Sequence, residues 1–257
     1  MPVNAYGVSD VGKKRERNED SFLVAEEQGL FLVADGMGGH LGGECASRLA
    51  TETIQEVVKQ LQEDPESTLL MPGIVNRNHP GEQLRYAIRA ASKRVFDESV
   101  LDVNLRGMGT TVVALLFDKE QADGSRQVHL AHVGDSRAYL VRDDTIRQLT
   151  TDHSLVTEQL KAGIITQQEV KHHRLKNIIT RSVGFQSDVE CDVTALSIEP
   201  GDTFLLCSDG LTNMLEDKDI LRLIARNDPK FVCERLIELA NRRGGDDNIT
   251  VVVVSCV

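Results

Sequence analysis

Several acidic residues of this chain stand where an apolar strand begins or ends, directly beside glycine or asparagine. Asp35 ends FLVADG, Asp135 ends LAHVGD, and Asp209 ends FLLCSD. Asp247 lies in GGDDNIT just before the apolar run ITVVVV, and Asp20 lies in RNED before another strand. One such aspartate is ordinarily a turn residue. The recurrence at several strand ends, each beside a residue that permits close backbone approach, indicates a shared site.

Strand ends that met in one site would place these negative charges close together, where they repel and raise one another's pKa. Divalent cations relieve that repulsion, and Mg²⁺ and Mn²⁺ prefer oxygen ligands. Gly36 offers a backbone carbonyl next to Asp35, and the glycines of DGMGGHLGG leave room for metal, water and substrate. The pattern therefore predicts a metal site of oxygen donors.

Composition limits the possible partners. The chain has 257 residues, 40% of them hydrophobic and 27% charged, which is ordinary for globular protein. A net charge of −11 argues against nucleic acid and anionic membranes. Five cysteines without a CxxC pair argue against a thiolate zinc site, and none has the arginine spacing of a cysteine-based phosphatase loop. With no secretory leader and no membrane-length apolar run, we expect free thiols in the cytoplasm.

Runs of strands followed by pairs of helices predict an α+β fold rather than alternating βαβ units. Strands are expected at 4–10, 20–25, 30–35, 110–117, 127–133, 138–142, 146–149, 189–198, 203–207 and in the last segment, and helices at 44–61, 83–100, 217–226 and 229–241. The first two helices are expected to form an antiparallel pair. The prolines between residues 63 and 81 predict a loop. The polar segment 152–181, with short helical pieces, is expected to cross one edge of the sheet.

Eight short motifs then occur in one order along the chain: RERNED, DGMGGH, GMGTT, HVGDSRAYL, QLTTDHS, ITRSVG, SDGLTNML and GGDDNIT. Together they resemble the metal-dependent protein phosphatases of the protein phosphatase 2C type, in their bacterial form, over residues 5–254. Residues 63–82 match none of these motifs. The resemblance implies a four-layer αββα sandwich: two antiparallel sheets flanked by helix pairs. It also implies a single catalytic domain, 1–257, with a mobile flap within about 152–181.

The resemblance implies a role for each site residue as well. Asp35 would bridge two metal ions, of which Asp209 and Asp247 would bind one and the Gly36 carbonyl the other. Glu19 and Asp20 would act mostly through metal-bound water, and Arg15 would bind the substrate phosphoryl group. Asp135 with Asp209 would hold a third, weaker ion. The ions would be Mn²⁺ or Mg²⁺. The family pattern places the ligand directly before Asn248, which selects Asp247 over Asp246.

The implied chemistry is hydrolysis of phosphoserine and phosphothreonine. Two ions roughly 3.5–4 Å apart lower the pKa of a shared water toward neutrality, and that water attacks phosphorus. Arg15 supplies a planar fork of donors for phosphate oxygens. A departing serine alkoxide is very basic, so a proton donor assists it, and His40 is the best candidate.

We therefore expect a bacterial protein serine/threonine phosphatase that reverses the signalling of serine/threonine kinases. Its expected partners are phosphorylated proteins, including the kinases themselves, and we expect a monomer that binds neither nucleic acid nor membrane. Two alternatives stay open: a phosphatase for small phosphate esters, and a non-catalytic phosphoprotein-binding module. The presence of Arg15, Asp35, Asp209 and Asp247 disfavours the binding module.

Overall fold

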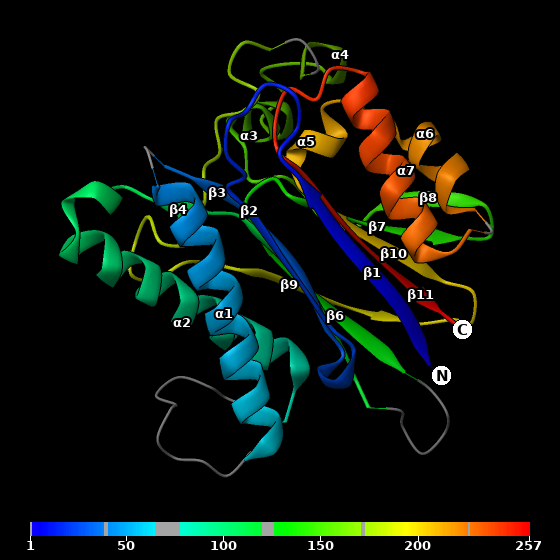
Figure 1. The fold of residues 1–257 in the computed structure, drawn as a ribbon, viewed down its shortest axis with the longest axis horizontal. Helices are drawn as coiled ribbons and strands as arrows, with labels where there is room; N and C mark the ends of the chain where they lie inside the picture. Colours follow the sequence, from blue (N-terminus) through cyan, green and yellow to red (C-terminus); the bar gives the residue numbers. More distant parts are fainter. Residues whose placement is uncertain (1, 39–40, 65–77, 120–125, 171–172, 226) are drawn as a thin grey trace.

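Two antiparallel sheets form the centre of the computed structural model, which describes residues 2–38, 41–64, 78–119, 126–170, 173–225 and 227–257 (Figure 1). One sheet contains, in spatial order, β1 (Val3–Asp10), β11 (Ile249–Cys256), β10 (Thr203–Cys207), β7 (Arg137–Arg142) and β8 (Thr145–Gln148). The other contains β2 (Asp20–Ala25), β3 (Leu30–Met37), β5 (Val112–Phe117), β6 (Gln127–Val133) and β9 (Asp192–Ser197), with β4 (Gly109–Thr110) paired to β3.

Helices cover the outer face of each sheet (Figure 1). Helices α1 (Gly42–Glu63) and α2 (Pro80–Leu101) pack on the β3 sheet, α6 (Asp217–Ile224) and α7 (Pro229–Arg242) pack on the β11 sheet, and the short helices α3 (Leu155–Lys161), α4 (Gln167–Val170) and α5 (Asp209–Thr212) lie at one end. Short 3₁₀ turns occupy Glu26–Gln28 and Val103–Leu105. This arrangement confirms the predicted α+β sandwich of four layers. Within the described ranges, no helix has both the length and the apolarity needed to cross a bilayer.

Strand β11 shows why the sequence builds these layers. Side chains of a strand alternate between its two faces. Val251 and Val253 join the core under α6 and α7, whereas Val252 and Val254 join the core between the two sheets. The unbroken apolar run ITVVVV therefore reflects a central strand that is buried on both faces.

The predicted strand 110–117 is wrong at Thr111, where the structure divides it into β4 and β5. Thr110 pairs with Gly36 and also forms a bridge with Val183. Thr111 instead donates its N–H to the carbonyl of Asp35 at 2.9 Å. The break therefore occurs where the chain supports an acidic strand end.

Other boundaries differ less. Helix α2 begins at Pro80 rather than at residue 83, because proline is well accommodated in the first helical turn. Strand β9 is shorter than predicted and begins at Asp192. Most of the predicted loop, residues 65–77, lies outside the described residues.

Candidate metal centre

Elements of both sheets bring aspartates to the end of the sandwich that carries α5. Asp35, near the end of β3, stands directly opposite Asp20 in the β2–β3 register. Asp209 begins α5 one residue beyond Ser208, which follows β10, and Asp247 lies just before β11. Asp135 lies in the turn between β6 and β7. These five residues are called the acidic cluster below.

The mutual repulsion within the acidic cluster indicates that its members share one site. Burial raises the pKa of Asp35 well above its usual range, and repulsion from each of the other four aspartates raises it further. Burial also raises the pKa of Asp20 and of Asp135 to about 7 in each case. The charges therefore oppose one another in a partly dehydrated setting.

Asp20 is fixed by two hydroxyl groups and keeps one oxygen unpaired. Its Oδ2 accepts from Ser208 Oγ at 2.8 Å and from Thr250 Oγ1 at 2.6 Å. Its Oδ1 is buried and has no hydrogen-bond partner among the described residues. A buried carboxylate oxygen without a partner costs free energy, so Oδ1 indicates a group that binds there in the working protein.

Thr111 links two members of the acidic cluster. Its Oγ1 accepts from the N–H of Asp35 at 3.0 Å and lies 2.7 Å from Oγ of Ser136. Since Ser136 directly follows Asp135, one pair of hydroxyls connects the end of β3 that carries Asp35 with the turn that carries Asp135. Sequence reasoning did not identify this pair, because Ser and Thr are common and carry no local signal.

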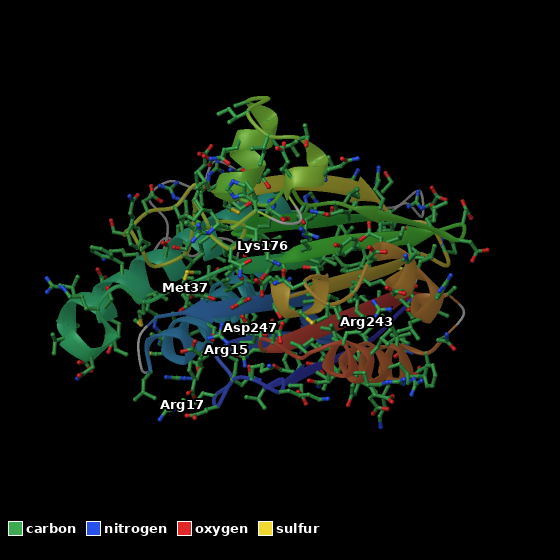
Figure 2. The ribbon with its side chains drawn as sticks, turned by 90° about the horizontal axis from the view of Figure 1, so that it is seen from above. Arg15, Arg17, Met37, Lys176, Arg243 and Asp247 are labelled. Carbon is green, nitrogen blue, oxygen red and sulfur yellow. The ribbon has the colours of Figure 1, made fainter. Side chains whose placement is uncertain are left out.

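Arg15 forms an ion pair with Asp247, a member of the acidic cluster (Figure 2). Its Nη2 donates to Asp247 Oδ2 at 2.8 Å, and this bond raises the pKa of Arg15. The side chain of Arg15 is still 51% exposed, so its planar fork also faces outward. Asp246 is exposed, whereas Asp247 is half-buried beside Arg15. The predicted phosphate-binding residue and the predicted metal ligand are therefore direct neighbours.

Close backbone contacts explain the glycines beside Asp35. A Cβ on Gly36 would lie 2.1 Å from the carbonyl oxygen of Gly43 and 2.4 Å from that of Glu19. The N–H of Gly36 donates to the same Glu19 carbonyl at 3.1 Å. Burial raises the pKa of the Glu19 carboxyl, which lies against Gly43. His40 lies outside the described residues.

A groove of about 900 Å³ runs from Asp135 and Asp209 between the segment 152–181 and helices α5 and α6. Asn213 connects its two walls: Nδ2 donates to Asp209 Oδ2 at 3.0 Å, and Oδ1 accepts from Lys176 Nζ at 3.1 Å. Sequence reasoning missed Asn213 and Lys176, because no pattern in the sequence brings them together. The groove is suitable for a peptide that leads to the acidic cluster.

The acidic cluster fits hard divalent ions. Its donors are all oxygens, which Mg²⁺ and Mn²⁺ prefer, and cations would relieve both the unpaired Oδ1 of Asp20 and the raised pKa of Asp35. Among the described residues, no three carboxylates of the acidic cluster have ligand atoms within 4.8 Å of one another. In the part of the chain that the structure describes, the trio of His, Cys, Asp or Glu ligand atoms within 4.8 Å of one another is His132, His153 and Asp192.

Comparisons with known proteins agree with this geometry. The family model for protein phosphatase 2C matches residues 11–244. The chain is 38% identical over 252 residues to the serine/threonine phosphatase stp of Listeria welshimeri, covering 96% of this chain and 93% of that protein.

Two solved structures extend the comparison. The serine/threonine phosphatase PstP/Ppp of Mycobacterium tuberculosis is 34% identical, with a TM-score of 0.85 and coverage of 100% of this chain and 99% of that one. The catalytic domain of PstP in complex with 2 manganese ions is 34% identical, with a TM-score of 0.81 over 98% of this chain and 97% of that one.

Proposed function

This chain belongs to the protein phosphatase 2C family and is a protein serine/threonine phosphatase, and from that premise we propose which residues perform the reaction. Asp35, the Gly36 carbonyl, Asp209 and Asp247 hold two divalent ions, and Asp135 with Asp209 holds a third, weaker one. The observation that carries this assignment is that five aspartates from both sheets meet at one end of the sandwich, where Asp20 keeps a buried carboxylate oxygen unpaired among the described residues. Glu19 and Asp20 act through water next to the ions.

Divalent ions in such a site supply a more acidic water as nucleophile and stabilise the charge of the phosphoryl group. The PstP catalytic domain with 2 manganese ions supports this use of metal, and we propose Mn²⁺ or Mg²⁺ for this chain. Three aspartates around two divalent ions leave about one positive charge by formal count, whereas a phosphoserine carries about −1.5 to −2 at pH 7. The loaded site therefore attracts the substrate even though the protein is acidic.

The residues of the chain orient the substrate. Arg15 binds the phosphoryl oxygens through its planar fork, and its hydrogen bond to Asp247 supports this role because it already directs the guanidinium toward the acidic cluster. Thr111 holds the backbone of Asp35, and Ser208 with Thr250 holds Asp20. His40 is proposed to give the departing alkoxide its proton.

The substrates are phosphorylated proteins. We propose that they include targets of serine/threonine kinases of the same cell and the kinases themselves, and that the enzyme is a cytoplasmic monomer. We also propose that residues 1–257 form one catalytic domain and that the segment 152–181, called the flap below, covers the groove. The groove beside Asp209 supports a peptide substrate rather than a small ester.

The test measures turnover of a phosphothreonine peptide and of a small aryl phosphate before and after EDTA, and again after Mn²⁺ is added. We expect activity on both substrates, complete loss with EDTA and recovery with Mn²⁺. Full turnover by the demetallated protein would contradict the metal mechanism. Turnover of the aryl phosphate alone would favour a small-ester phosphatase, and turnover of neither would favour a binding module.

A further inference from the structure

The first two residues of the flap, Asp152 and His153, bind the turn that carries Asp135 on both of its sides. The N–H of His153 donates to the carbonyl of Gly134 at 2.9 Å, and the N–H of Gly134 donates back to Nδ1 of His153 at 3.2 Å. On the other side, Arg137 donates Nε to Oδ1 of Asp152 at 2.9 Å and Nη2 to Oδ2 at 2.7 Å. Two consecutive flap residues, Asp152 and His153, therefore bind the residue just before Asp135 and the residue two positions after it.

The returning end of the flap joins the same hydrogen-bonded group. The N–H of Thr180 donates to the carbonyl of His153 at 2.8 Å. Ser154 forms a bridge with Ile179, and Leu155 donates its N–H to the carbonyl of Ile178 at 2.8 Å. His153 thus lies where both ends of the flap meet the β6–β7 turn.

The β6–β7 turn has little freedom to move on its own. Gly134 has φ +102, in the region that favours glycine, and a Cβ there would lie 2.6 Å from Cγ2 of Thr111. Thr111 also bonds the N–H of Asp35 and the hydroxyl of Ser136. A shift of this turn would therefore disturb both Asp135 and the support of Asp35.

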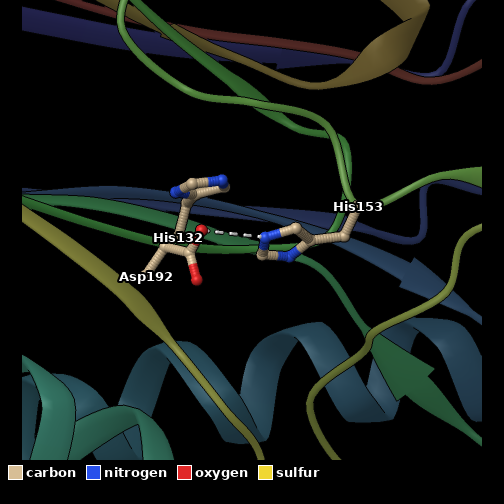
Figure 3. A group of neighbouring side chains, drawn as sticks. All are labelled: His132, His153 and Asp192. Atoms are coloured by element: carbon tan, nitrogen blue, oxygen red, sulfur yellow. Dashed lines mark hydrogen bonds and ion pairs between the residues drawn. The ribbon is translucent and has the colours of Figure 1, made fainter. Parts of the chain in front are cut away.

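The hydrogen bonds of His153 argue against a metal ion between His132, His153 and Asp192 (Figure 3). Because the N–H of Gly134 donates to Nδ1, the neutral ring of His153 carries its proton on Nε2. That Nε2 lies 3.4 Å from Oδ2 of Asp192, and the ring stacks on that of His132 at 4.7 Å. Neither ring nitrogen of His153 then offers a lone pair to a metal.

We propose that His153 is a positioning residue that holds Asp135 within the acidic cluster and couples its position to the flap. This inference rests on the proposed function, because Asp135 matters through the weaker ion assigned to it. The bond from Gly134 N–H to Nδ1 is the essential contact. The contact of Nε2 with Asp192 fixes the ring orientation, since Arg181 also donates to Asp192 Oδ1 at 3.1 Å.

Three variants separate these contacts. His153→Asn places an acceptor oxygen near the position of Nδ1 and keeps the Gly134 bond, His153→Gln reaches instead toward the position of Nε2, and His153→Ala removes both. The variants are compared by calorimetric titration with Mn²⁺ and by kcat and KM on a phosphothreonine peptide. Circular dichroism and thermal unfolding establish that each variant is folded.

We expect His153→Ala and His153→Gln to lower the affinity of the weakest Mn²⁺ site and to lower kcat by about 10–100-fold, the usual effect of removing a group that orients a metal ligand. KM should change little, and His153→Asn should retain most of the wild-type kcat and Mn²⁺ affinity. His129→Asn is the matched control: His129 is buried on β6, the strand that leads into the turn of Asp135, but it contacts Asp118 instead. It should lower the thermal midpoint without changing Mn²⁺ binding.

Unchanged Mn²⁺ binding in folded His153→Ala, or an Asn variant as impaired as Ala, would overturn the proposal. So would a Zn²⁺ ion bound by the wild type and lost in Asp192→Asn, since the trio would then be a metal site. A wild-type protein that binds Mn²⁺ but does not hydrolyse the peptide would contradict the proposed function alone. In that case the calorimetric comparison would still decide the role of His153.

Discussion

At the scale of single residues, we expect the acidic cluster to lower the stability of the metal-free protein. The raised pKa of Asp35 means that its ionised form is disfavoured in the folded state. Its contribution to stability is therefore present below the unfolded pKa, about 3.9, and is lost as the pH rises through the folded pKa. At neutral pH the carboxylate of Asp35 opposes folding unless cations are bound.

Asp35→Asn should consequently have opposite effects on stability and on activity. In EDTA at pH 7, the variant should unfold at a higher temperature than the wild type, because one repelling charge is gone. With Mn²⁺ it should lose more than about 100-fold in kcat, beyond the usual loss from a residue that only supports a ligand. Calorimetry and peptide turnover measure the two effects, and near-normal kcat would show that the metal assignment is wrong.

Asp135→Ala separates a turn residue from a metal ligand. A turn role predicts a loss of about 1 kcal/mol in unfolding free energy with near-normal turnover. A role at the weaker ion predicts a folded protein that keeps two ions and loses most turnover. The loss should be larger on a phosphopeptide than on an aryl phosphate, because a serine alkoxide is the poorer leaving group. Metal counting beside kinetics on both substrates decides between them, and normal peptide turnover would return Asp135 to the turn.

At the scale of elements, the close approach of β3 and α1 depends on two glycines that differ in what surrounds them. A Cβ on Gly36 would meet backbone carbonyls at 2.1 and 2.4 Å, whereas a Cβ on Gly43 would meet the carboxyl group of Glu19 at 2.7 Å or more. Backbone cannot move aside as a flexible side chain can. The two positions therefore form a matched pair.

Gly36→Ala should lower the unfolding free energy by about 1–3 kcal/mol, the usual cost of inserting a methyl group into a packed region. Gly43→Ala should cost less, because the side chain of Glu19 can rotate away. Urea unfolding in EDTA measures both changes without the contribution of metal. Equal destabilisation by the two substitutions would show that Glu19 is held as rigidly as the backbone.

Most elements could be predicted from the sequence because their apolar periodicity reflects burial. The alternating faces of β11 and the amphipathic helices α1 and α7 are examples. The break at Thr111 could not be predicted, because it depends on hydrogen bonds to Asp35, which is 76 residues away in the chain. Local patterns carry no information on such a partner.

At the scale of the whole molecule, the sequence predicts the residues of the acidic cluster but not the residues that hold them in place. The aspartates stand where apolar strands begin or end, so the pattern and the family motifs predict them together. Ser208, which directly follows β10, and Thr250 of β11 reach Asp20 of β2 only when the two sheets pack. Both strands belong to the other sheet, so the position of Asp20 reports on the sandwich as a whole.

Metal binding should therefore stabilise the entire fold. Ligand that binds the native state alone stabilises it by about 2.7 kcal/mol at a hundredfold excess over Kd, which for a chain of this length raises Tm by about 5–11 °C. We expect relief of the repulsion within the acidic cluster to supply part of that binding free energy. Differential scanning calorimetry in EDTA and in saturating Mn²⁺ measures the shift.

Salt and charge controls distinguish this mechanism from general cation binding to an acidic surface. Raising the ionic strength with NaCl screens exposed charges and should raise the Tm of the EDTA-treated protein only slightly, because the cluster is partly buried. Asp35→Asn should start from a higher metal-free Tm and show a much smaller Mn²⁺ shift. Equal Mn²⁺ shifts in wild type and variant would place the stabilising ions elsewhere on the surface. The absence of any shift in the wild type would contradict a clustered site, because five opposed aspartates without a cation would then have no destabilising effect to relieve.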